Sequence, residues 1–375
     1  MVDGTDRALW NRARRGLFAP VSVIFALLTV VCAVGLRIPE PLQYIPFALS
    51  LIVLGLPHGA LDHVVLSRLA RQAPDARAIA FVSLLYLVVG AVVVLLWFAA
   101  PAIAFVLFIL MTWFHWGQGD LHVEATRVGA GSPSRLTRAG MLLVRGALPM
   151  VVPLVAFPEA YLGVFRDTTG VIAVSLVDAS PLFDSTTRML IAAALGLLVV
   201  VTFSGTARAR WPSGAGRRAW WGDLGEVMLL AAFFAVVPPI LAVGLYFCLW
   251  HSLRHIVRLS LLDPEWRSAG ARAPGTSGST ASAIRRFAVR SAPITAIALL
   301  LLVALFFVVP QAGVTSGALL GLYLVLISAL TLPHVIIVSI MDARQEVWAR
   351  GPKEQLVGAG SAAAALDTLE GGRAR

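Results

Sequence analysis

Ten long apolar stretches, separated by short polar connections, constrain this chain more than any other feature. An α-helix needs about 20 mostly apolar residues to cross a bilayer, and it satisfies its own backbone hydrogen bonds there. The chain has only 13% charged residues, whereas soluble proteins average about 25%. We therefore predict an all-α, polytopic transmembrane helical bundle with spans near 17–36, 43–67, 78–98, 101–121, 139–157, 187–204, 222–238, 239–262, 287–309 and 315–341.

The fifth span is the weakest of the ten, because Arg145, Pro149 and Pro153 interrupt it and residues 159–184 are a candidate half-inserted segment. Two adjacent prolines predict a tight hairpin between the seventh and eighth spans. We expect residues 1–350 to form a single membrane domain. The polar, Ala- and Gly-rich stretch 351–375 is expected to be a flexible tail.

The basic residues give the chain a net charge of +10, and their positions follow the positive-inside rule. Arginine clusters precede the first span and follow the second, fourth, sixth and eighth spans, whereas the alternate connections hold few basic residues. We therefore predict a multi-pass protein of the cell membrane with both termini cytoplasmic. No basic and aromatic pattern of a nucleic-acid binder is present, so we expect no nucleic-acid partner.

The seven histidines all lie in segments that should end at the same membrane face. In the predicted topology the second, fourth, eighth and tenth spans run in one direction and carry their histidines near their C-terminal ends. Ionisable side chains within bilayer helices are rare and point to function, and imidazole is the commonest protein ligand for transition metals. The sequence therefore predicts a metal site formed from His58, His63, His115, His122, His251, His255 and His334, or from some of them.

Helical spacing sorts these histidines. His251 and His255 are four residues apart and share a helix face. His58 and His63 point roughly 140° apart on a regular helix and should not bind one ion. We predict that the metal ligands, which are also the catalytic residues, are His58, His115, His251 and His255. His63 and His334 are possible additional ligands, and hydrogen bonding between helices is the alternative for them and for His122.

Several other residues accompany the histidines. Asp62 and Asp120 are predicted to accept the free ring N–H of metal-bound histidines and so to orient them. Arg254 is expected to meet Asp62, Asp120, a substrate or lipid headgroups, and Arg145 and Glu226 are buried charges without an evident chemical role. Glycines near the histidines should let helices approach closely; these are Gly59, Gly117 and Gly119.

A group of aromatic residues flanks the histidines in the sequence. They are candidates for the wall of an apolar substrate tunnel, although an interfacial aromatic belt or ordinary packing more often explains such residues. The candidate tunnel residues are Trp113, Phe114, Trp116, Phe247 and Trp250.

The histidine segments also resemble the successive motifs of the Brp/Blh family of membrane β-carotene 15,15'-dioxygenases. The resemblance extends from His58 to His334 and covers most of the chain. The segments are Pro57-His58-Gly59-Ala60-Leu61-Asp62-His63, Phe114-His115-Trp116-Gly117 with Asp120, Trp250-His251-Ser252-Leu253-Arg254-His255, and Leu332-Pro333-His334.

The resemblance implies that O2 cleaves the central double bond of β-carotene, or of a related carotenoid, to give two molecules of retinal. It also implies a non-haem Fe(2+) cofactor on His58, His115, His251 and His255, a substrate dissolved in the lipid bilayer, and a possible functional link to a rhodopsin. Neutral imidazoles that leave coordination positions open suit O2 chemistry at iron.

Two other functions fit a histidine-containing membrane bundle. A membrane di-iron desaturase or hydroxylase would carry more histidines, grouped in several His-rich boxes, than the seven dispersed ones here. A transporter for protons or a divalent metal would show broken helices in two matching halves, and these are not evident in the sequence.

Overall fold

The computed structural model describes residues 4–70, 72–73, 75–127, 133–172, 180–263, 277–309 and 314–348. Within these ranges every regular element is a helix and there is no strand. Ten helical segments among them are long and apolar enough to cross a membrane. The prediction of an all-α bundle with ten spans is therefore confirmed. The stretch 351–375, expected to be a tail, lies outside the described residues.

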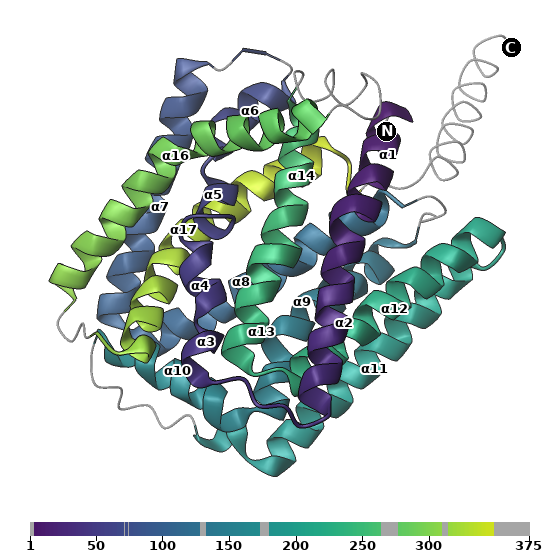
Figure 1. Cartoon of the computed structure of the whole chain (residues 1–375), viewed down its shortest axis with the longest axis horizontal. Coiled ribbons are helices and arrows are strands. Elements are labelled where there is room, and N and C mark those ends of the chain that lie inside the picture. The colour runs from purple at the N-terminus through teal and green to yellow at the C-terminus, as the bar shows by residue number, and fades with distance from the viewer. Residues whose placement is uncertain are drawn as a thin grey trace, which may run out of the picture.

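The helices pack side by side, and the N-terminus lies at the same end of the bundle as the C-terminal end of the last helix (Figure 1). A chain that crosses a membrane an even number of times begins and ends on the same side. That this side is the cytoplasmic one stays a prediction. Eight spans are nearly continuous helices: α1 (Gly4–Ala13) with η1 (Arg14–Phe18) and α2 (Ala19–Ala33), α7 (Ala76–Ala99), α8 (Pro101–Ala125), α9 (Arg135–Ala156), α11 (Ser185–Arg210), α12 (Gly214–Val236), α16 (Ser277–Val308) and α17 (Ser316–Arg344).

The fifth span, α9, is a full-length helix despite its internal Pro149 and Pro153. It packs against α8, α11 and α12 near the centre of the bundle, where neighbouring helices compensate for the lost backbone hydrogen bonds. Two short helices follow it, α10 (Pro158–Gly170) and η2 (Ser180–Phe183).

The second span is broken into four short helices, α3 (Glu40–Gln43), α4 (Ile45–Ser50), α5 (Gly55–Gly59) and α6 (Asp62–Leu69). Pro57 cannot donate a backbone hydrogen bond to the preceding turn. A Cβ on Gly55 would lie 2.6 Å from the Cβ of Ser50 and 2.7 Å from the ring of Phe247. Irregular backbone at membrane depth is tolerated where it lines a cavity or is buried in protein. Because α5 ends at Gly59 and α6 begins at Asp62, the predicted regular helix through His58 and His63 is wrong.

The eighth span contains a π-helix. It consists of α13 (Pro239–Leu245), the π-helical η3 (Tyr246–Ser252) and α14 (Leu253–Leu262). Short π-helical segments within α-helices are frequent at functional sites. Here the wider turn includes His251 and ends just before the turn that carries His255.

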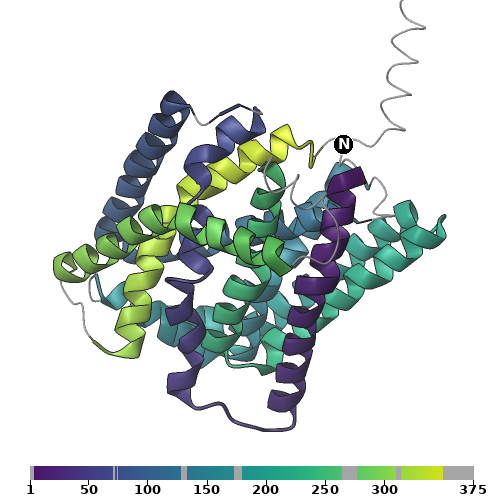
Figure 2. The same cartoon turned by 45° about the horizontal axis from the view of Figure 1, so that its top comes forward.

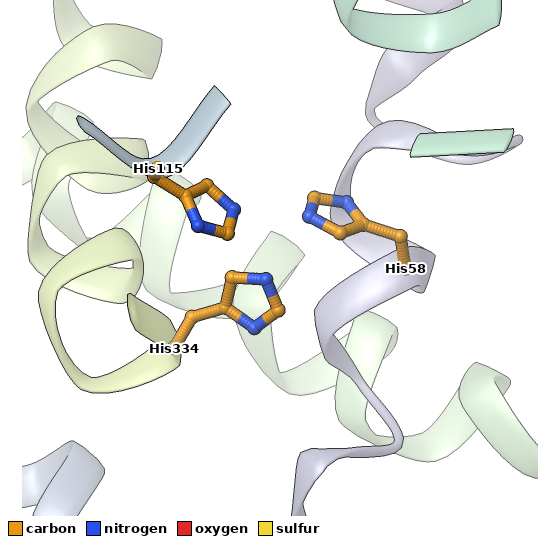
Figure 3. A group of neighbouring side chains, drawn as sticks. All are labelled: His58, His115 and His334. Atoms are coloured by element: carbon orange, nitrogen blue, oxygen red, sulfur yellow. The ribbon is translucent and has the colours of Figure 1, made fainter. Parts of the chain in front are cut away.

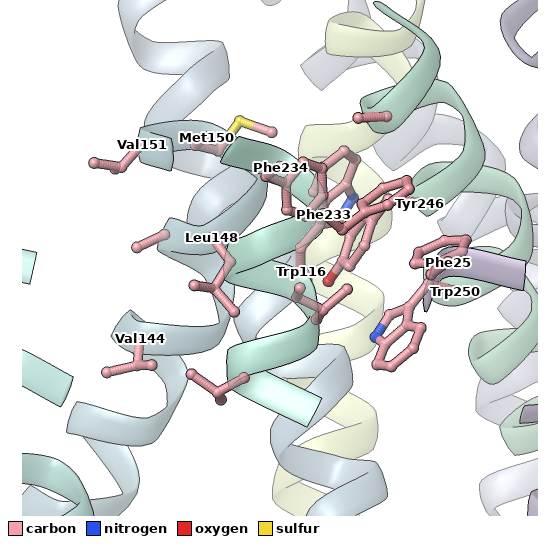
Figure 4. Close-up of a cluster of buried hydrophobic side chains, with 14 of the residues drawn as sticks. Phe25, Trp116, Val144, Leu148, Met150, Val151, Phe233, Phe234, Tyr246 and Trp250 are labelled. Atoms are coloured by element: carbon pink, nitrogen blue, oxygen red, sulfur yellow. The ribbon is translucent and has the colours of Figure 1, made fainter. Parts of the chain in front are cut away.

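An aromatic layer holds η3 in place (Figure 4). Phe25 of α2 stacks on Phe233 of α12 with ring centroids 4.2 Å apart, and lies 5.7 Å from Trp250 of η3. Trp116 of α8 lies 4.9 Å from Tyr246. Such ring pairs add about 0.5–1.5 kcal/mol each to the burial of their apolar area. The layer therefore fixes the π-helical turn between α2, α8 and α12.

Glycines bring α8 and α9 into backbone contact. A Cβ on Gly117 would overlap the carbonyl of Leu142, and one on Gly146 would overlap the carbonyl of Trp113. Gly59 and Gly119 do not bring two backbones together as expected, because a Cβ on either would only be in ordinary van der Waals contact with an imidazole. A Cβ on Gly59 would lie 3.5 Å from Nδ1 of His334, and a Cβ on Gly119 would lie 3.4 Å from Nδ1 of His251.

Candidate metal centre

Five buried imidazoles from four spans form one cluster in the bundle. His58 comes from the broken second span, His115 from α8, His251 and His255 from the eighth span, and His334 from α17. Ring centroids lie 5.0 Å apart for His58 and His334, 5.5 Å for His58 and His251, 5.5 Å for His58 and His255, 4.7 Å for His115 and His251, 4.8 Å for His115 and His334, and 5.0 Å for His255 and His334.

His334 is central to this cluster. One ring nitrogen each from His58, His115 and His334 lies within 4.8 Å of the other two (Figure 3). A second group within the same distance joins His334 to His255 and Asp62. Nitrogens bound to one ion at about 2.1 Å are at most about 4.2 Å apart. Small side-chain rotations would therefore bring the first three onto one ion.

Unpaired nitrogen atoms in the cluster fit a metal. The Nε2 atoms of His115, His251, His255 and His334 are buried and have no hydrogen-bond partner. Leaving a buried polar atom unpaired costs about 1–3 kcal/mol, and one shared ion would satisfy all four of these atoms. Neutral imidazoles suit iron, zinc, copper and nickel alike. The residues present therefore fit a transition-metal ion without specifying which one.

The opposite ring nitrogens of three of the clustered histidines face oxygen acceptors. Nδ1 of His334 lies 2.6 Å from Oδ2 of Asp62, Nδ1 of His58 contacts the carbonyl of Gly55, and Nδ1 of His115 lies 3.4 Å from Oε1 of Gln118. A histidine that donates its Nδ1–H keeps a free lone pair on Nε2, which is the tautomer that a metal requires. This hydrogen-bonding pattern independently favours coordination through Nε2.

Asp62 orients His334 and not its sequence neighbour His58. Its Oδ2 also accepts a hydrogen bond of 2.7 Å from the hydroxyl of Tyr86 on α7. No signal in the sequence indicates this pairing, because Asp62 and His334 are 272 positions apart along the chain.

Replacing Asp62 by alanine is expected to lower metal affinity about 10- to 100-fold, because His334 loses the acceptor that fixes its tautomer and aim. Metal content of the purified variant after dialysis against graded chelator measures this loss. Tyr86→Phe is the matched control, since it removes one hydrogen bond from the same carboxylate and leaves the one to His334, so its loss should be smaller. Equal metal retention in Asp62→Ala and the unmodified protein would contradict this role.

The remaining predicted site residues have other partners, although His63 lines the same cavity as the clustered histidines. Asp120 accepts no hydrogen bond from an imidazole; it accepts hydrogen bonds from Arg254 at 2.9 Å and from the indole of Trp250 at 3.1 Å. His63 donates its ring N–H to the carbonyl of Ala60 at 2.9 Å, and the ring of His122 packs 5.8 Å from that of Trp10.

Asp120 belongs to a buried network of four arginines and four carboxylates. Asp223, which is fully buried, lies at the centre, with ion pairs to Arg210 at 2.5 Å, Arg127 at 2.9 Å and Arg145 at 3.1 Å. Equal numbers of the two signs balance the charge. The network joins α8, which carries His115, to α14, which carries His255; its members are Asp120, Glu124, Arg127, Arg145, Arg210, Asp223, Glu226 and Arg254.

A cavity of about 880 Å³ with almost entirely apolar walls reaches the histidines. His58, His115, His251 and His334 all line it. Of the predicted tunnel residues, only Trp116 and Phe247 are lining residues.

The other candidate tunnel residues face elsewhere. Trp250 lies in the aromatic layer, Trp113 donates to the carbonyl of Leu143 at 2.8 Å, and Phe114 is 41% exposed on the outer surface. Most of the wall comes instead from α7, α16 and α17, whose apolar residues carry no local signal of a cavity.

Comparisons with known proteins place the chain in a family. The family described as beta-carotene 15,15'-dioxygenase matches residues 49–342, a range that includes all five clustered histidines. The chain belongs to this family. No solved structure matches it.

Named relatives of the β-carotene 15,15'-dioxygenase family cover most of the chain. It is 37% identical over 348 residues to the protein described as "Probable beta-carotene 15,15'-dioxygenase Blh" of Halobacterium salinarum, covering 90% of this chain and 97% of the relative. It is 27% identical over 323 residues to a Brp protein of the same organism, covering 84% and 88%. A protein named beta-carotene 15,15'-dioxygenase from uncultured marine bacterium 66A03 is 27% identical over 210 residues, covering 56% and 66%.

Proposed function

We propose that this protein uses O2 to cleave the central 15,15' double bond of β-carotene, or of a closely related carotenoid, to give two molecules of retinal. One observation carries the proposal: a cluster of histidines with unpaired nitrogens lies at the wall of a large apolar cavity inside a membrane bundle. The family match and the names of the relatives support the substrate and the bond.

The proposed cofactor is one Fe(2+) ion, held by His58, His115, His251 and His255 as the sequence predicts, together with His334. When bound, iron would activate O2 next to the double bond. The reaction balances without a reductant, because the C=C bond breaks and each of its carbons receives one oxygen atom of O2 as an aldehyde.

The chain's own residues orient the ligands and shape the substrate site. Asp62 holds the ring of His334 with its Nε2 directed away from the carboxylate. The rings of Trp116 and Phe247 lie 5.7 Å and 6.4 Å from that of His251, so apolar surface adjoins the imidazoles. Apolar walls exclude water and fit a hydrocarbon chain. The position of the polyene along this wall would then select the bond that is cut.

The proposed location is the cell membrane, where ten apolar helices would hold the site within the bilayer. A carotenoid dissolved in lipid could reach it without crossing water. The retinal formed there would be available to a membrane-bound rhodopsin.

Expression in cells that accumulate β-carotene tests the proposed activity. Extracted pigment should lose its colour and contain retinal, whereas cells with the His58→Ala variant should keep their carotenoid. Unchanged carotenoid in cells that contain intact, iron-loaded protein would overturn the proposal. Vesicles that take up protons or divalent metal without any carotenoid turnover would identify a transporter instead.

A further inference from the structure

The cavity at the metal centre is open on one side and closed on the other. On the closed side, its lining residues Phe47, Trp116, Met150 and Phe247 are all buried. On the other side, residues of α7 and α16 line the cavity and are also exposed on the outer surface of the bundle. A residue that does both marks the point where a cavity reaches the surface.

These exposed lining residues form one stripe on each helix. On α7 they are Ser83, Leu87, Ala91, Leu95 and Phe98, at spacings of four, four, four and three. Residues at such spacings share a helix face. On α16 the stripe recurs at spacings of three, four, three and four, in Ile294, Ile297, Leu301, Ala304 and Val308.

The two stripes border a seam between helices that scarcely touch. Each helix packs on α17, but α7 and α16 make few direct contacts with one another. Both lie at the same edge of the bundle in two views (Figure 1 and Figure 2). The stripe on α7 extends about 22 Å from Ser83 to Phe98 at 1.5 Å per residue. Leu87 is 69% exposed and Leu301 is 49% exposed, so the seam faces the surroundings of the bundle.

The histidines lie between the seam and the closed side. Toward the seam, Tyr86 of α7 bonds to Asp62, which bonds to His334. Toward the closed side, the ring of Phe247 lies 5.6 Å from that of His58. A chain cut at its centre needs apolar space on both sides of the reacting atoms, and this cavity offers it.

We propose that the seam between α7 and α16 is the lateral portal through which the carotenoid enters from the bilayer, and that half of the bound polyene occupies it. This inference rests on the proposed function. The argument is the continuity of the seam with the histidine-lined cavity, the apolar character of both stripes apart from Ser83, and their exposure at membrane depth. Retinal would leave by the same route.

Bulky substitutions at the seam test the portal. Ala304 and Ala91 are exposed and line the cavity, whereas Ala296 and Val92 are exposed on the same two helices and do not line it. Ala304→Trp and Ala91→Trp should each lower kcat/KM for β-carotene in vesicles at least about tenfold, with bound iron unchanged. Ala296→Trp and Val92→Trp should leave both quantities unchanged. Full kcat/KM in both iron-loaded portal variants would overturn the proposal.

A second measurement does not depend on turnover or on a tryptophan variant that folds. In a background with Cys32 and Cys248 replaced by alanine, Leu301→Cys at the seam and Val303→Cys beside it are labelled with a membrane-soluble maleimide. Leu301 lines the cavity and Val303 does not, although Val303 is 55% exposed. Added β-carotene should slow labelling of Leu301→Cys alone, and added phospholipid should not.

Equal labelling of Leu301→Cys with and without β-carotene, or protection by phospholipid alone, would show that the seam holds only lipid and would overturn the portal. Failure of the proposed function looks different, because unmodified iron-loaded protein would then leave β-carotene intact.

Discussion

The His334→Ala variant is expected to lose bound iron and at least about 99% of β-carotene turnover, as much as His58→Ala or His115→Ala loses. His334 lies within 4.8 Å of ring nitrogens from both of those residues, and its Nε2 has no other partner. Loss of an outer partner of a metal ligand already costs about 10- to 100-fold in affinity or activity. Removal of a ligand itself should cost more.

Iron content and retinal formation by the purified variants measure this effect. His122→Ala is the matched control, since His122 is also a buried histidine of the bundle but packs against Trp10, away from the cluster. It should retain iron. A fully active, iron-loaded His334→Ala protein would show that His334 is not a ligand. The ligands would then be the four histidines predicted from the sequence, and each of their alanine variants should be inactive.

The Asp223→Ala variant is expected to lower the free energy of unfolding by about 3–5 kcal/mol. The substitution leaves Arg127, Arg145 and Arg210 without their shared carboxylate, and removal of one partner from a buried ion pair costs about this much. Unfolding of the purified protein by denaturant in detergent micelles measures the change.

Glu159→Ala is the matched control for this prediction. Glu159 is an exposed carboxylate at the start of α10, and surface substitutions change stability by less than about 0.5 kcal/mol. The Asp223→Ala protein should also bind less iron, because the network connects the helices of His115 and His255. Equal stability of the two variants would contradict a structural role for the network.

The fold can be predicted from the sequence because membrane spans are encoded locally. Apolar length alone locates all ten helices, including the proline-containing α9. A prediction from the local sequence is wrong inside the second span. The helix is broken between His58 and His63, so the two residues do not have regular helical spacing. Near that break a Cβ on Gly55 would lie 2.7 Å from the ring of Phe247, which comes from another span and gives no signal in the local sequence.

The candidate site is predictable as a group of histidines but not as a set of partners. Ionisable side chains are rare in membrane-spanning helices, so the histidines stand out among the apolar residues of the sequence. Their hydrogen-bond acceptors depend on which helices adjoin, whereas proximity in the sequence pairs Asp62 with His58 and Asp120 with His115. In the structure Asp62 bonds to His334, and Asp120 bonds to Arg254 and Trp250.

Arg145 and Glu226 show the same limit. Each is an unexplained charge in an apolar span of the sequence, and together they form an ion pair of 3.1 Å. The only hint of this ion pair in the sequence is that apolar spans of one chain contain opposite charges. Pairing them depends on the packing of α9 on α12, which no local pattern encodes.

Iron stoichiometry combined with X-ray absorption of the purified, active protein tests the metal centre most directly. We expect one iron per chain with imidazole nitrogen ligands, and the loss of that signal together with turnover when His334 is replaced. Two irons per active chain, or full turnover by protein free of metal, would contradict a single-ion centre built by the five histidines.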